Sequence, residues 1–273
     1  MAILVTGATG TVGRHVVSGL VQKGKQVRAV SRNPENAGLP EGVEVTKGDL
    51  AAPESLRAAL QGVTALYLIM SSDNAHTALQ TDPKVIEIAK EAGVRRVVIL
   101  MDYEGNPVEQ IVKDSGMQWT LLKPVEFMAN ALVDWQPSIR AEGIVREPFG
   151  YALSARVHEA DIAAVAVEAL TEDGHHEESY YLTGPEALSR VDAVNKIAAA
   201  IGKEIRFVEL TEEQARQGWK DQGYGEEDIE FFVQMGKNPP EVGYTVLPTI
   251  ELVTGRPAKT FDEWIAEHKD EFM

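Results

Sequence analysis

Three glycines near the start of the chain, Gly7, Gly10 and Gly13, follow one another at a spacing of three residues. An apolar run over residues 2–5 precedes them and an apolar pattern typical of a helix follows, so they are expected to connect a strand to a helix. In such a turn the first glycine permits a tight bend, the second lets the main chain approach a phosphate, and the third allows the helix to pack closely on the sheet. The first N–H groups of the helix attract an anion. The spacing therefore predicts a pyrophosphate-binding site.

A P-loop is the alternative phosphate cradle, and it requires Gly-Lys followed by Ser or Thr. Arg14 and His15 follow the last glycine here, so a P-loop is excluded.

Arg32 lies directly after a second predicted strand, over residues 26–30. Dinucleotide-binding folds place an acidic residue about 20 positions beyond the glycines when the ribose carries a free 2′-hydroxyl group. Residues 31–33 are Ser-Arg-Asn and include no carboxylate. A guanidinium forms charge-assisted and often bidentate hydrogen bonds with a phosphate. These residue types favour NADP(H) over NAD(H), the alternative being that Arg32 is a solvated loop residue.

The composition limits the possible partners and the location. The 273 residues carry a formal net charge of −16, whereas nucleic acids and anionic membranes require clustered Lys and Arg. We therefore expect a small-molecule substrate, no nucleic acid and no membrane, and the oligomeric state stays open. The chain has no cysteine, no stretch of the ~18 apolar residues that a membrane span needs and no secretory signal, so a cytoplasmic location is expected. No metal site is predicted.

Strands and helices alternate through the first 124 residues. The predicted strands lie near residues 2–5, 26–30, 43–46, 64–70, 95–101 and 118–122, with a helical pattern in each interval but one. Near-continuous apolar runs such as residues 64–70 are typical of strands that are covered on both faces. The pattern predicts an α/β fold, a doubly wound parallel Rossmann sheet with right-handed crossovers.

The regular alternation of strand and helix patterns ends after Pro124, and a smaller C-terminal α/β substrate lobe is expected there. Residues 1–124 together with about 155–184 are predicted to form the Rossmann NADP(H)-binding core. The substrate-covering lobe is predicted to consist of residues from about 125 to 154 and from 185 to 273.

Several motifs resemble those of the NmrA-like group of atypical short-chain dehydrogenase/reductases. They are residues 6–13, 31–34, 48–50, 116–124 and 127–130, and later residues 159–166, 182–185 and 260–264. Together they span nearly the whole length. The resemblance implies a Rossmann core with NADP(H) along the strand ends and a small C-terminal lobe over the nicotinamide.

The resemblance also implies which residues contact the cofactor. Those around the pyrophosphate would be Gly7, Thr9, Gly10, Thr11 through its main chain, Val12 and Gly13. Arg32 would bind the 2′-phosphate, Asp49 and Leu50 the adenine, Met70 and Ser71 the adjoining ribose, and Lys123, Pro124 and Phe127 the nicotinamide side.

The chain departs from the superfamily at the catalytic pair, which is a tyrosine with a lysine four residues later. None of the seven tyrosines is followed by a lysine at that spacing. Tyr103 and Lys123, just beyond the fifth and sixth predicted strands, are candidate proton donors. The competing interpretations are an exposed loop tyrosine for Tyr103 and an electrostatic contact with the cofactor for Lys123.

Two functions therefore remain open. The first is an NADP(H)-dependent reductase that transfers a hydride to a small carbonyl, quinone, enone or imine without the Tyr-x-x-x-Lys pair. The second is a non-catalytic NADP(H)-binding redox sensor or regulatory protein of the NmrA type. Aromatic residues in the predicted lobe favour the enzyme, because they suit a substrate pocket.

Overall fold

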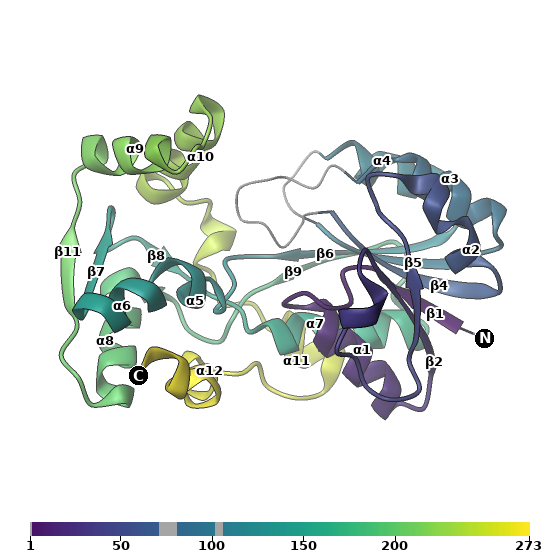
Figure 1. Ribbon diagram of the computed structural model, residues 1–273, viewed down its shortest axis with the longest axis horizontal. Coiled ribbons are helices and arrows are strands. Elements are labelled where there is room, and N and C mark those ends of the chain that lie inside the picture. The colour runs from purple at the N-terminus through teal and green to yellow at the C-terminus, as the bar shows by residue number, and fades with distance from the viewer. Residues whose placement is uncertain (1, 71–80, 102–105) are drawn as a thin grey trace. The chain divides into compact units, whose positions relative to one another are not determined.

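The computed structural model describes residues 2–70, 81–101 and 106–273, and its largest element is a parallel seven-stranded sheet (Figure 1). The strands are β1 (Ala2–Val5), β2 (Gln26–Ser31), β3 (Glu44–Lys47), β4 (Val63–Ile69), β5 (Arg96–Leu100), β6 (Gln118–Pro124) and β9 (Glu178–Leu182). Their order is β3-β2-β1-β4-β5-β6-β9, so the strand order reverses between β1 and β4. The predicted doubly wound Rossmann sheet is confirmed, and the reversal marks the place where ligands bind in such sheets.

Helices cover both faces of this sheet. On one face, α1 (Gly13–Gln22) packs against α7 (Glu159–Thr171). On the other face lie α2 (Arg57–Leu60), α3 (Lys84–Glu91) and α4 (Pro107–Asp114), and a hydrophobic core fills the space beneath them (Figure 1). The short 3-10 helices η1 (Pro34–Asn36) and η2 (Pro53–Leu56) complete this part.

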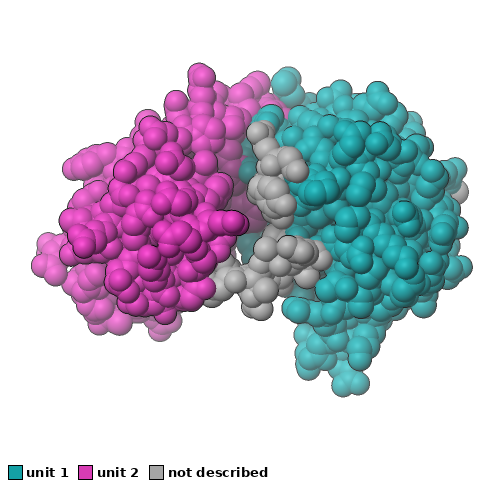
Figure 2. All heavy atoms as spheres, turned by 90° about the horizontal axis from the view of Figure 1, so that it is seen from above, with its two compact units in different colours: residues 1–124, 159–182, 252–255 teal, residues 125–158, 183–251, 256–273 magenta. Residues whose placement is uncertain are grey.

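The chain divides into two compact units, coloured separately in Figure 2. The first unit consists of Met1–Pro124, Glu159–Leu182 and Leu252–Gly255. The second consists of Val125–His158, Thr183–Glu251 and Arg256–Met273. The assignment of one unit to the cofactor and the other to the substrate stays a prediction.

The second unit contains short strands and most of the C-terminal helices. Its strands are β7 (Ile144–Glu147), β8 (Leu153–Ser154), β10 (Leu188–Ser189) and β11 (Arg206–Glu209). Its helices are α5 (Asn130–Asp134), α6 (Gln136–Glu142), α8 (Arg190–Ile201), α9 (Glu212–Asp221), α10 (Glu226–Lys237), η3 (Glu241–Gly243), α12 (Phe261–His268) and η4 (Lys269–Phe272), and α11 (Thr249–Thr254) begins there. A separate core includes Trp264 and Phe261, whose stacked rings have their centres 5.4 Å apart.

Strand β7 of this unit was not predicted from the sequence. The stretch from Gly143 to Gly150 shows only turn signals, yet β7 lies within it and pairs in parallel with β11. Val145 is its one buried residue, so β7 has no alternating apolar pattern. The strand forms because a distant segment pairs with it, which local sequence signals do not record.

Candidate functional site

The glycine turn between β1 and α1 contains two steric requirements for glycine. Gly7 has a φ of 58°, which lies in the left-handed region that favours glycine. A Cβ atom on Gly13 would lie 2.0 Å from the main-chain oxygen of Gly7. The N–H of Gly10 donates to that same oxygen at 2.9 Å and closes the turn. The turn therefore brings the start of α1 directly against the end of β1.

The N-terminus of α1 is open to an anion. Val12 occupies the N-cap position and provides no side-chain hydrogen bond, and the first turn of α1 contains no acidic residue. The N–H groups of Arg14 and His15 already donate to the carbonyls of Gly10 and Val12, at 3.2 and 3.0 Å, so an anion would bind to the N–H groups that precede them and to the positive end of the helix dipole. Thr6 ties the end of β1 to β4, because its hydroxyl donates to the carbonyl of Tyr67 at 3.0 Å and accepts the N–H of Ile69 at 3.0 Å.

Arg14 lies against the same turn. Its Nε donates to the carbonyl of Gly10 at 3.2 Å, and its Nη2 donates to the carbonyl of Thr9 at 3.1 Å. The residue is exposed, so its guanidinium stays accessible beside the turn. Arg14 was not among the predicted site residues, although its positive charge directly follows the last glycine and could have identified it.

Arg32 follows the last residue of β2 and is exposed. Within the described part of the chain it forms no hydrogen bond and no ion pair. The preceding Ser31 accepts the N–H of Asn33 at 3.1 Å through its hydroxyl, which shapes the turn after the strand. The guanidinium is therefore available to a phosphate at the carboxyl end of β2.

The residues predicted to contact adenine and ribose differ from Arg32, because the structure engages them in a turn or buries them in the core. The carboxylate of Asp49 accepts the N–H of Ala51 at 3.0 Å and so stabilises the turn after β3. Leu50 and Met70 are only 7% and 2% exposed and belong to the core beneath α2, α3 and α4. A cofactor contact by either would therefore involve its main chain. The candidates Ser71 and Tyr103 lie outside the described residues.

Lys123 lies near the carboxyl end of β6 and is held by α4. Its Nζ lies 3.3 Å from the carboxylate of Glu109, which also accepts from Lys113 Nζ at 2.7 Å. The hydrogen bond from Lys113 and the charge of Lys123 hold the pKa of Glu109 below its usual value, although partial burial opposes them. Pro124 ends β6 and is half-buried. Phe127 belongs to the second unit, where it forms a β-bridge with Val157.

The second unit contains a carboxyl group with an unusual pKa. Although Asp134 is exposed as a residue, the protein around its carboxyl group desolvates that group and raises its pKa to about 7, and the negative charges of Glu147 and Glu126 add to the shift. Desolvation also raises the pKa of Glu147, whose carboxylate accepts the indole N–H of Trp135 at 3.1 Å. Arg156 is 3% exposed and pairs with Glu126 at 3.1 Å. This cluster could not be identified from the sequence, because its members lie on α5, on β7 and in the loops beside them.

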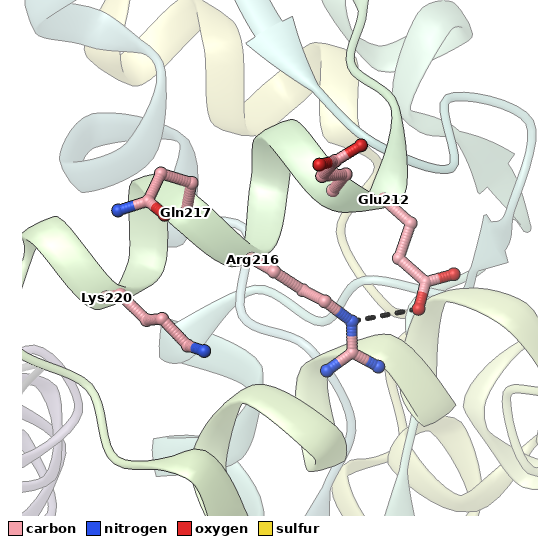
Figure 3. A pocket seen from close by; sticks show the side chains of 5 residues that line it. Glu212, Arg216, Gln217 and Lys220 are labelled. Carbon is pink, nitrogen blue, oxygen red and sulfur yellow. Dashed lines mark hydrogen bonds and ion pairs between the residues drawn. The ribbon is translucent and has the colours of Figure 1, made fainter.

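A surface hollow of about 430 Å³ lies on α9 in the second unit, and Figure 3 shows it from close by. Its lining residues are Glu212, Glu213, Arg216, Gln217 and Lys220. Arg216 forms an ion pair with Glu212 at 2.9 Å, which Figure 3 shows, and a second ion pair with Glu230 at 2.8 Å. No predicted cofactor residue lines the hollow, and both of its cations, Arg216 and Lys220, are already paired with carboxylates. It therefore offers no phosphate site.

The described residues contain no candidate metal site and no candidate membrane span. None of their histidine, aspartate and glutamate side chains gather in groups of three or more that could hold a metal ion. Within the same ranges, the helices are too short or too polar to cross a membrane.

Comparison with known proteins gives consistent matches. A family model described as NAD(P)H-binding matches residues 7–106. The (4-alkanoyl-5-oxo-2,5-dihydrofuran-3-yl)methyl phosphate reductase of Streptomyces griseus is 38% identical, and the alignment covers 99% of both chains. The NAD(P)H azoreductase of Xenophilus azovorans is 35% identical, again over 99% of both chains. The structure of an NADPH-dependent quinone oxidoreductase from Escherichia coli, complexed with NADPH, matches with a TM-score of 0.81 and 25% identity, covering 98% of this chain and 99% of that one.

Proposed function

Because the chain belongs to the NmrA-like group of NAD(P)H-binding short-chain dehydrogenase/reductases, we propose that it is an NADPH-dependent reductase of small conjugated acceptors. It is an oxidoreductase, and NADP(H) is its cofactor. The observation that carries the proposal is the extent of the similarity. The Streptomyces and Xenophilus reductases align over 99% of this chain, so the likeness includes the second unit as well as the glycine turn.

The residues around the turn fit a dinucleotide. The main chain of the glycine turn and the open N-terminus of α1 would hold the pyrophosphate, with Arg14 as an additional positive charge. The exposed guanidinium of Arg32 would bind the 2′-phosphate that distinguishes NADPH from NADH. The other assignments are Thr9, Thr11 and Val12 to the pyrophosphate, Asp49 and Leu50 to adenine, Met70 and Ser71 to ribose, and Lys123, Pro124 and Phe127 to the nicotinamide side. When it is bound, NADPH supplies a hydride.

The names of the relatives support conjugated acceptors. They denote a dihydrofuran ring that carries an oxo and an alkanoyl group, an azo compound and a quinone. Each of these contains an electron-poor double bond whose conjugated oxygen or nitrogen can accept negative charge when a hydride adds. Such acceptors depend less on a dedicated acid than a simple carbonyl does, which suits a chain without the Tyr-x-x-x-Lys pair.

The test is the oxidation of NADPH by the purified protein across a panel of acceptors. The panel contains a naphthoquinone, an azo dye, an alkanoyl-substituted unsaturated lactone with and without a phosphate ester, and a simple aldehyde. We expect at least about tenfold faster turnover with the conjugated acceptors than with the aldehyde, a barrier difference of about 1.4 kcal/mol. Tight NADPH binding without turnover of any acceptor would contradict the proposal and favour an NADP(H)-sensing role.

A further inference from the structure

Lys123 and Tyr181 occupy directly paired positions at the carboxyl ends of β6 and β9. Side chains at paired positions of neighbouring strands lie on the same face of the sheet. Lys123 Nζ lies 5.7 Å from the centre of the Tyr181 ring. Both residues belong to the first unit, so their relationship is fixed within one compact body.

The ammonium of Lys123 is held firmly and is not fully neutralised. Its side chain is 15% exposed, and its Nζ lies 3.3 Å from the carboxylate of Glu109 on α4. That carboxylate is shared, because Lys113 Nζ lies 2.7 Å from it. Two positive charges and one negative charge therefore leave a net positive charge close to Tyr181.

We propose that Tyr181 donates the proton in the reduction and that Lys123 stabilises the negative charge left on its phenol oxygen. The inference rests on the reductase function proposed above. A tyrosine and a lysine on neighbouring strands would then replace the pair that this sequence does not carry at a spacing of four residues. Glu109 is a positioning residue, because it acts through Lys123.

The location of the pair suits this chemistry. Ligands bind beyond the carboxyl ends of the strands in parallel sheets, and both side chains lie at that edge. The ammonium of Lys123 lies over the Tyr181 ring, 5.7 Å from its centre, and a positive charge near a phenol favours the release of its proton. Tyr103 and Lys123 were the candidates that the sequence offered, and Tyr181 adds a group whose partner is visible in the structure.

The step balances in atoms and electrons. Hydride addition gives the acceptor two electrons and one hydrogen, and it leaves a negative charge on the conjugated oxygen or nitrogen. The O–H bond of Tyr181 then breaks while a bond between the proton and that atom forms. The phenolate that remains beside Lys123 regains its proton from water. NADPH is the only reductant that the step requires.

Tyr180 provides a matched control on the same strand. It lies next to Tyr181 in β9, so its side chain points to the opposite face, and its hydroxyl lies 2.9 Å from Nδ1 of His175. Tyr180→Phe and Tyr181→Phe remove the same hydroxyl group from neighbouring positions. A general loss of stability in β9 would therefore affect both variants.

The first measurement is kcat with NADPH and a naphthoquinone, together with the Kd for NADPH from fluorescence titration. We expect Tyr181→Phe to lower kcat about a hundredfold, the lower end of the effect of removing a general acid, because a quinone depends less on one, while the Kd for NADPH stays unchanged. Tyr180→Phe should keep the wild-type kcat. A kcat for Tyr181→Phe within about twofold of wild type, or an equal loss in both variants, would overturn the inference.

The second measurement does not depend on turnover. Ultraviolet difference titration of the protein without cofactor should show one tyrosine that ionises at lower pH than the others. The signal should be absent in Tyr181→Phe, present in Tyr180→Phe and displaced to higher pH in Lys123→Met. An unchanged early signal in Tyr181→Phe would contradict the inference.

Failure of the two proposals can be told apart. If the wild-type protein reduces the quinone and Tyr181→Phe does so equally well, only the assignment of Tyr181 is wrong. If the wild-type protein binds NADPH and reduces no acceptor, the reductase function is wrong and the role of Tyr181 as proton donor falls with it. The titration then still decides whether Lys123 and Tyr181 interact electrostatically.

Discussion

A Cβ atom on Gly13 would lie 2.0 Å from the main-chain oxygen of Gly7. The obstacle is main chain, so it cannot rotate aside as the end of a flexible side chain can. The two glycines therefore fix how closely the start of α1 approaches the end of β1. This approach decides where the first N–H groups of the helix point, and those groups are the proposed anchor of the pyrophosphate.

Gly13→Ala is expected to weaken both the fold and the cofactor site. Relief of the clash must shift α1 or the turn, and overpacking of this kind costs about 1–3 kcal/mol of unfolding free energy. The displaced N–H groups should lower NADPH affinity at least about tenfold, which corresponds to about 1.4 kcal/mol. Urea unfolding and fluorescence titration with NADPH measure the two effects.

Gly218→Ala is the matched control for that variant. Gly218 lies within α9, and a Cβ atom there would meet no atom within 4 Å. Alanine is the better helix former, so this variant should be as stable as wild type or about 0.5–1 kcal/mol more stable. A Gly13→Ala protein with wild-type stability and affinity would show that the close contact is not required.

Local signals account for the part of the fold that could be predicted. The spacing of Gly7, Gly10 and Gly13 specifies the turn directly, and continuous apolar runs such as β4 identify buried strands without knowledge of their partners. The availability of Arg32 for a phosphate follows from its place at the end of β2. These features depend on neighbouring residues, so a single sequence reveals them.

Pairings between distant segments account for what could not be predicted. β7 exists because β11 pairs with it, and its own residues carry no strand pattern. Tyr181 becomes a candidate only once β9 is known to lie beside β6 with Lys123 opposite. The raised pKa of Asp134 likewise depends on desolvation by the surrounding protein and on the charges of Glu147 and Glu126, which the fold brings near.

Arg32→Ala should change the preference between the two nicotinamide cofactors. Loss of a hydrogen bond between a guanidinium and a phosphate costs about 1.5–3 kcal/mol, so the Kd for NADPH should rise about 10–150-fold. The Kd for NADH should stay within about twofold, because NADH has no 2′-phosphate. The control is Lys25→Ala, which removes an equal charge just before the other end of β2. This variant should change neither Kd. Equal losses for NADPH and NADH would refute the assignment of Arg32.

Arg14→Gln should weaken both cofactors to the same degree. The pyrophosphate is common to NADPH and NADH, and Arg14 lies against the turn that is proposed to hold it. Its side chain is exposed, so we expect a loss of about 0.5–1.5 kcal/mol, or about 2–12-fold in each Kd. The Kd of the wild-type protein should also rise with ionic strength more steeply than that of the variant. A loss confined to NADPH would instead place Arg14 at the 2′-phosphate.

Asp134→Asn should alter how stability depends on pH. The folded protein raises the pKa of Asp134 from 3.8 to about 7, so between these values the folded state keeps a proton that the unfolded state has lost. Stability must then fall as pH rises through this window, and the penalty is complete above pH 7. Asparagine carries no charge, so the variant should be more stable than wild type at pH 8. Because Asp134 is exposed, solvent screening reduces the expected gain to about 1 kcal/mol.

Unfolding in urea at pH 4 and pH 8 tests this sign directly. At pH 4 the variant and the wild-type protein should differ little, because Asp134 is protonated in the folded state. Glu54→Gln is a control of opposite sign, since hydrogen bonds from Arg57 and Lys84 lower the pKa of Glu54 to about 2. Its carboxylate stabilises the fold above its ordinary pKa of 4.5, and that contribution disappears as pH falls toward 2. Glu54→Gln should therefore be less stable than wild type at pH 8, where Asp134→Asn is more stable. If Asp134→Asn lost stability at pH 8, the carboxylate would be ionised and paired there, and the assigned desolvation would be wrong.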